Sequence, residues 1–248
     1  MLFSALSSKE NMLLFLLSLP TFLIALSVHE AMHGYVAYWQ GDPTAKNFGR
    51  LSLNPLKHFD LVGFLAMMLC GFGWAKPVPI NTRNFRNPRR GMALTALAGP
   101  VSNLILSYLG YILMIAVYGI SCHVSEIPAA LYAAYPKITY GDIFYHCMLN
   151  VESLRLLSII GLFFWLFSYY NLMLGLFNLL PIPPFDGSRI AGLLLPPKYY
   201  FRIMKYERII MIVVLVLLAI GIIQLPLDFL ITKCMQFFRF TLSWLPFL

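Results

Sequence analysis

Long apolar stretches separated by polar segments dominate the pattern along this chain. They run from about Asn11 to Trp39, from Gly91 to Ile120, within Ile159–Leu195, and from Glu207 to Leu225. Each is long enough to supply the roughly 20 residues with which a helix crosses a bilayer. Only helices and closed barrels satisfy their backbone inside lipid, so the pattern predicts an all-α polytopic membrane protein. We expect about four to five transmembrane helices in a single domain over residues 1–248.

The first apolar stretch also resembles a secretory signal peptide, because it is N-terminal and follows Lys9. It lacks a small-residue cleavage site, however, and it is longer than the roughly 7–15 apolar residues of such a signal. We therefore expect it to be retained as a membrane helix.

A shorter apolar stretch, Leu61 to Phe72, is too short to cross a bilayer and predicts a re-entrant or interfacial segment. It leads into residues 73–81, where Pro77 and Pro79 oppose helix and favour extended backbone. Together these stretches predict a short membrane hairpin. The extended part is a candidate edge for pairing with an unwound peptide strand, by β-augmentation. The alternative is a surface loop shaped by its prolines.

The connecting segments are more polar. Ser121 to Tyr140 is expected to be a loop, and Asp142 to Arg155 a helix at the membrane interface. The tail from Pro226 is apolar but contains Lys233 and Arg239, which favours an interfacial helix over a fifth crossing.

Composition excludes a water-soluble domain. The chain is 60% hydrophobic and only 11% charged, with a mean hydropathy of +0.76, whereas soluble domains carry about 25% charged residues. The net charge is +8, and the basic residues behind it are concentrated in two segments. Of the 18 Lys and Arg residues, eight lie in residues 41–90 and five in residues 181–208. Basic loops mark the cytoplasmic side, so the N-terminus is expected outside. A bacterial plasma membrane fits best, with an archaeal or organellar membrane as alternatives.

The basic residues do not predict a nucleic-acid partner, because no aromatic-basic surface accompanies them. The cluster Arg83–Arg90 is instead expected to meet anionic lipid headgroups. Cys122 and Cys147 are both expected on the outer side, where a disulfide is possible, but buried free thiols are the favoured interpretation.

The candidate chemistry lies in the first apolar stretch. His29 and His33 share one helix face at positions i and i+4, so both imidazoles can reach one metal ion. Glu30 lies beside them and can accept a proton from metal-bound water. An ionisable residue this deep in a membrane helix indicates function, and a polar cluster that packs helices together is the alternative.

A catalytic zinc usually has three protein ligands, and Asp186 is the best candidate for the third. It follows Pro181, Pro183 and Pro184, and irregular backbone at membrane depth is tolerated only where protein or a cavity surrounds it. Taken alone, Asp186 fits a helix N-cap equally well. Asn103 lies at a similar depth, where a helix-packing amide is as good an interpretation as a catalytic one.

These motifs resemble the site-2 protease family of intramembrane metalloproteases. The resemblance rests on His29-Glu30-x-x-His33 and Asn178-x-x-Pro181-x-Pro183-x-x-Asp186-Gly187. It extends to residues 41–46 and 49–55, to 73–79, and to Gly99-Pro100-x-x-Asn103.

The resemblance implies that His29, His33 and Asp186 bind one Zn²⁺ per chain and that Glu30 is the general base. Asn103 would hold substrate or stabilise the oxyanion. The substrates would be transmembrane proteins, and the active site would open towards the cytoplasm. The form expected is compact, without the peptide-binding insert that some members carry.

The sequence thus predicts an intramembrane zinc metalloprotease that cuts peptide bonds in or near transmembrane segments. Its role would be regulated intramembrane proteolysis or clearance of signal-peptide remnants. One alternative is an inactive relative that binds membrane helices, which the intact Glu30 disfavours. A metal transporter is a further alternative, which would require polar residues along a path to both faces.

Overall fold

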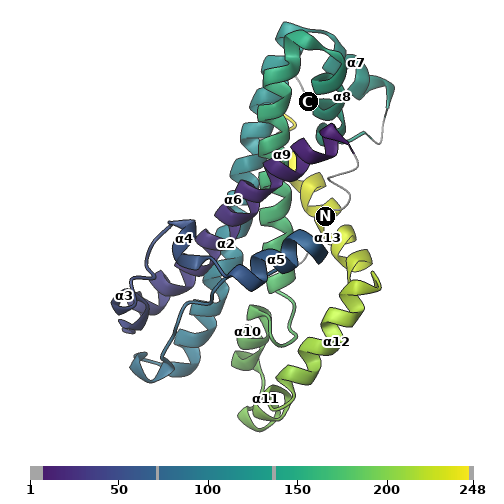
Figure 1. Cartoon of the computed structure of the whole chain (residues 1–248). Helices are drawn as coiled ribbons and strands as arrows, with labels where there is room; N and C mark the ends of the chain where they lie inside the picture. The colour runs from purple at the N-terminus through teal and green to yellow at the C-terminus, as the bar shows by residue number, and fades with distance from the viewer. Residues whose placement is uncertain (1–7, 71–72, 136–137, 246–248) are drawn as a thin grey trace.

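Three long apolar helices form the centre of the protein in a computed structural model that describes residues 8–70, 73–135 and 138–245. They are α2 (Lys9–Trp39), α6 (Pro88–Val124) and α9 (Arg155–Asn178), and all three pack against one another (Figure 1). Each is long and apolar enough to cross a membrane. The prediction of an all-α membrane protein is confirmed.

Small and hydroxyl-bearing residues hold α6 and α9 together. The Ser107 hydroxyl donates to the Ser168 carbonyl at 2.8 Å, and the Ser168 hydroxyl donates to the Ser107 carbonyl at 2.9 Å. A Cβ at Gly175 would lie 3.1 Å from the Pro100 carbonyl oxygen, so the two backbones approach closely there. Lipid tails are as apolar as leucine, so close packing and interhelical hydrogen bonds, not apolar burial, hold membrane helices together.

Short elements follow the C-terminal end of α2: α3 (Thr44–Asn47), α4 (Pro55–His58), α5 (Leu61–Cys70) and the 3₁₀ turn η1 (Thr82–Asn84). The short apolar segment is a ten-residue helix, α5, and its re-entrant or interfacial position stays a prediction. Residues 71–72, the end of the predicted stretch, lie outside the described residues. Residues 73–81 form neither helix nor strand, as the prolines predicted.

Asp42 fastens the end of this non-helical segment to α2. Its buried carboxylate accepts hydrogen bonds from the backbone N–H of Thr44 at 3.1 Å and of Asn81 at 2.7 Å. It also accepts from the Asn84 side-chain amide at 2.8 Å. Burial alone would raise the pKa of Asp42, but these hydrogen bonds lower it below its ordinary value. A lowered folded-state pKa contributes stability above the ordinary pKa that is lost as pH falls, so this anchor weakens in acid.

The C-terminal third follows α9 through a proline-rich turn. It contains α10 (Asp186–Leu194), α11 (Pro197–Met204), α12 (Glu207–Ala219) and α13 (Gln224–Thr241). α10 packs against α6, and α13 packs against α9. In Figure 1, α3, α10 and α11 lie at the same end of the protein, opposite the N-terminal end of α2. The segments around α3 and around α10 and α11, which carry several of the basic side chains of residues 41–90 and 181–208, therefore share one end, the basic end.

Two boundaries differ from the predictions. The expected loop between Ser121 and Tyr140 contains the end of α6 and a further helix, α7 (Ile127–Ala134), before α8 (Tyr140–Asn150) and η2 (Glu152–Leu154). Pro128 lies in the first turn of α7, where a proline needs no N–H partner.

The last apolar stretch is also shorter than predicted. α12 has 13 residues and ends at Ala219, followed by a turn in which Gly221 has φ +81°. α13 is the expected helix in the tail, and it is not among the three helices apolar enough to cross a membrane. Cys122 and Cys147 are free thiols, as favoured from the sequence.

Arg89 joins the start of α6 to the end of α10. Its guanidinium donates to the backbone carbonyls of Gly192 at 3.3 Å, Leu193 at 2.7 Å and Leu195 at 2.8 Å. The last carbonyls of a helix lack intrahelical partners and carry partial negative charge. Arg89 therefore caps α10, although the sequence had suggested a lipid contact for the cluster that contains it.

We expect Arg89→Ala to loosen α10, because three carbonyl oxygens lose their cationic donor. Hydrogen exchange of the α10 amides should rise by about fivefold, corresponding to roughly 1 kcal/mol, the net contribution of a typical hydrogen bond. Arg90→Ala is the matched control, since the exposed Arg90 side chain makes no hydrogen bond within the described residues. Equal effects of the two variants on α10 would show that Arg89 is no cap.

Candidate metal centre

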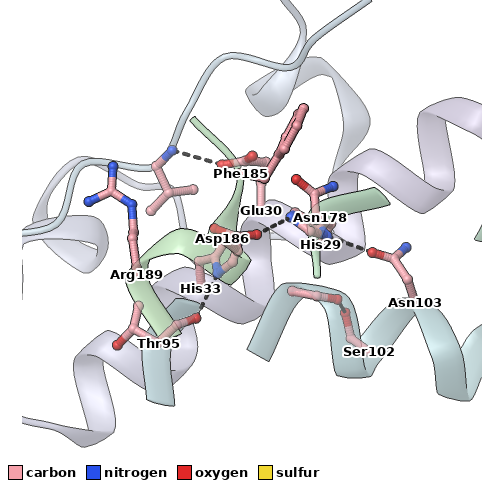
Figure 2. A network of polar contacts seen from close by, with 12 residues as sticks. His29, Glu30, His33, Thr95, Ser102, Asn103, Asn178, Phe185, Asp186 and Arg189 are labelled. Atoms are coloured by element: carbon pink, nitrogen blue, oxygen red, sulfur yellow. Dashed lines mark hydrogen bonds and ion pairs between the residues drawn. The ribbon is translucent and has the colours of Figure 1, made fainter. Parts of the chain in front are cut away.

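Three side chains with metal-binding atoms meet where α2 crosses the start of α10. His29 and His33 lie one turn apart on α2, and Asp186 is the first residue of α10 (Figure 2). Asp186 Oδ2 lies 3.1 Å from His29 Nε2 and 3.2 Å from His33 Nε2. One ligand atom from each residue falls within 4.8 Å of the others, and both imidazoles are buried. The three residues singled out from the sequence are therefore brought together.

The hydrogen bonds on the far side of each ring define its tautomer. Nδ1 of His33 lies 2.7 Å from the carbonyl oxygen of Thr95, which can only accept. Nδ1 of His29 lies 2.6 Å from Oδ1 of Asn103. Both Nδ1 atoms therefore carry a proton, and both Nε2 atoms face Asp186.

This donor set fits a zinc ion. Two neutral imidazole nitrogens and one carboxylate are typical ligands of catalytic zinc, which keeps a further position open. Ligand atoms about 2.0–2.1 Å from a tetrahedral zinc lie roughly 3.3 Å apart, close to the 3.1 and 3.2 Å observed. Outer hydrogen bonds to each imidazole are also typical of such sites.

Asn103 is fully buried, and all of its side-chain donors are engaged. Its amide nitrogen donates to the carbonyl of Ala25 at 3.1 Å and to Oδ1 of Asn171 at 2.9 Å. These two acceptors fix the amide orientation, with Oδ1 towards His29. An amide NH₂ group has two donors, so none remains for a substrate carbonyl or an oxyanion. This geometry favours a role for Asn103 in orienting His29, and the substrate contact that the resemblance implies stays a prediction.

Gly99 lets α6 pass directly over the two imidazoles. A Cβ at this position would lie 2.6 Å from His33 Nε2 and 2.7 Å from His29 Cε1. No real Cβ approaches ring atoms so closely, so any other residue would push α6 away from the centre. The first glycine of the Gly99-Pro100-x-x-Asn103 motif therefore has a steric role.

Glu30 connects the centre to the non-helical segment. Its Oε2 accepts a hydrogen bond from the backbone N–H of Val78 at 2.9 Å, which Figure 2 shows as a dashed line. Val78 is buried, whereas Glu30 is partly exposed. Residues 73–81 thus lie beside the predicted general base, which the sequence order alone did not reveal.

Comparison with known proteins now identifies the family. The model of peptidase family M50 matches residues 17–221. The chain belongs to peptidase family M50. It is 39% identical over 198 residues to "Putative zinc metalloprotease YwhC" of Bacillus subtilis (strain 168). The aligned residues make up 79% of this chain and 77% of that protein. No solved structure matches the chain. The resemblance to site-2 proteases is confirmed, and the protein is a membrane metalloprotease of that family.

Sequence reasoning missed two partners of the centre in this M50 peptidase. Asn171 is fully buried in α9 and donates to the Phe167 carbonyl at 2.8 Å. Its sequence signal was an amide side chain in the middle of an apolar span, where polar residues are rare and usually paired. The Thr95 contact uses a backbone carbonyl, for which residue type gives no signal. Within the described residues, His58, His123 and His146 do not belong to the group.

We expect Asn103→Leu to weaken zinc binding by about 10- to 100-fold, the usual effect of losing an outer partner of a metal ligand. The leucine fills similar volume but leaves the His29 Nδ1–H without an acceptor. Chelator competition on the purified full chain measures the dissociation constant, with helix content as the folding check. Ser102→Ala is the matched control, because Ser102 bonds only within α6. Unchanged zinc affinity with lost activity would instead support the substrate role first predicted.

Proposed function

We propose that this M50 member is an intramembrane metalloendopeptidase that holds one zinc ion per chain with His29, His33 and Asp186. The observation that carries the proposal is the convergence of these three ligand atoms beside Glu30, on a helix apolar enough to cross a membrane. Ionisable groups at membrane depth are costly and persist where they are paired and functional.

Glu30 is the group that moves the proton. Zinc, when bound, supplies Lewis-acid chemistry that makes a water molecule nucleophilic near neutral pH. Glu30 Oε2 is held by the Val78 N–H, and no hydrogen bond engages Oε1 within the described residues. Oε1 is therefore free to accept a proton from the attacking water and to return it to the leaving amine.

Residues 73–81 support a role in presenting the substrate as an extended strand. The N–H groups of Lys76 and Val78 point inward, to the His58 carbonyl at 2.9 Å and to Glu30. Alternate residues of an extended chain face opposite edges, so the opposite edge belongs to Pro77 and Pro79, which have no N–H. From Pro77 to Pro79 that edge offers carbonyls only, and a substrate strand would use its own N–H groups to pair with them.

We further propose that the basic end faces the cytoplasm, with the N-terminus outside and the chain in a bacterial plasma membrane. The concentration of Lys and Arg at residues 41–90 and 181–208 supports this orientation. The centre would then be reached from the cytoplasmic side. The substrates would be transmembrane proteins, in regulated intramembrane proteolysis or in clearance of signal-peptide remnants.

Glu30→Gln tests the proposal, because the glutamine carbonyl still accepts from Val78 N–H but no longer accepts a proton. We expect fragments that end within transmembrane segments in cells with the wild-type chain and at least 100-fold fewer with the variant. Mass spectrometry of membrane-protein termini makes the comparison, and equal zinc content of the two purified chains is the control. Matching fragment profiles from two folded, zinc-loaded chains would contradict proteolysis and favour a helix-binding relative.

A further inference from the structure

A second polar feature lies at the basic end, apart from the candidate metal centre. It is an open hollow of about 310 Å³, lined by Phe48, Gly49, Arg50, Lys57 and Lys76. Three of these five residues are cations, and none is acidic. We call it the basic hollow.

The loop that carries these cations is pinned internally, so they are held together. The buried His58 side chain donates to the Ser52 carbonyl at 2.7 Å, and the Arg50 guanidinium donates to the Lys57 carbonyl. The Lys76 backbone N–H donates to the His58 carbonyl at 2.9 Å, which brings the third cation to the same place.

Gly49 keeps the hollow open. It has φ +65°, a left-handed conformation that favours glycine. The position its Cβ would occupy lies 4.0 Å from the Lys57 ammonium. A larger side chain at position 49 would therefore partly fill the hollow beside the Lys57 ammonium group.

No carboxylate neutralises these charges within the described part of the chain. The ion pairs there join Asp186 to His29 and His33, and the Lys57 and Lys76 ammonium groups have no hydrogen-bond partner. Like charges held close together repel, more strongly beside a low-dielectric bilayer than in water. An anion in the hollow would relieve that repulsion, and a phosphate group accepts from all three side chains.

Exposed apolar side chains of the same segment favour a position of the hollow at the membrane surface. Phe48, which lines the hollow, and Leu53 and Leu56, which lie between Arg50 and Lys57 in the sequence, have exposed fractions of 70%, 59% and 80%, although none belongs to a membrane-crossing helix. Apolar side chains interleaved with Lys and Arg are typical of segments that lie at the headgroup and acyl-chain boundary.

We propose that the basic hollow binds the phosphate group of an anionic phospholipid, with Arg50, Lys57 and Lys76 as its cationic contacts. The bound lipid would also hold Lys76 in place and thereby tether residues 73–81, whose Val78 contacts Glu30. Binding itself does not depend on proteolysis, so this proposal and the proposed function fail separately.

The experiment measures binding of phosphatidylglycerol and phosphatidylcholine to the full chain in detergent by native mass spectrometry. The test variant is Lys57→Gln with Lys76→Gln. The matched control is Lys198→Gln with Lys205→Gln, which removes two exposed cations of the same basic end near α11. Each cation near an anionic lipid strengthens binding by about fivefold, so phosphatidylglycerol affinity should fall roughly 25-fold in the test variant and remain near wild type in the control.

Wild-type phosphatidylglycerol affinity in the test variant, or an equal loss in the control, would overturn the proposal. Lys57→Arg with Lys76→Arg keeps both charges and should bind like the wild type, which separates loss of charge from misfolding. Glycerol phosphate and inorganic phosphate are soluble probes of the same chemistry. If either bound as tightly as phosphatidylglycerol, the assignment to a lipid would be wrong.

Discussion

A polar group inside a bilayer is stable only when it is paired, and the centre of this protein is built on that constraint. His29 Nδ1–H bonds to Asn103, Asn103 donates to Asn171 and to the Ala25 carbonyl, and Asn171 donates to the Phe167 carbonyl. The chain of bonds runs through α2, α6 and α9. The hydrogen bonds that pair these buried groups therefore also fix the relative positions of the three helices. They engage Nδ1 of His29 and leave its Nε2 to bind a metal ion.

The close packing of the helices serves the same arrangement. Gly99 lets α6 lie against both imidazoles, and the Ser107–Ser168 pair holds α6 to α9. Asp186 is brought in by α10, which Arg89 caps from the start of α6. Glu30, in α2, and Asp42, three residues past its end, hold the non-helical segment at two points. The centre is thus held from several elements that are distant in the sequence.

Much of this was predictable, because the decisive signals are local or chemically unusual. Apolar length predicted α2, α6 and α9, and the i, i+4 histidines with Glu30 predicted the centre. Asp186 was found because it is a carboxylate at membrane depth. The role of Asn103 was not predictable, since it depends on which acceptors its two N–H donors meet. The Val78–Glu30 contact was not predictable either, because it joins a backbone N–H to a side chain that is distant in the sequence. The helix α7 and the end of α12 were missed because short helices and turns leave weak apolar periodicity.

X-ray absorption spectroscopy at the zinc edge, on the purified full chain, tests the central claim most directly. The account predicts one zinc per chain, with two imidazole nitrogens and oxygen ligands at about 2.0–2.1 Å. Thiolate sulfur at about 2.3 Å, or a zinc signal that persists unchanged after replacement of both His29 and His33 by alanine, would contradict it.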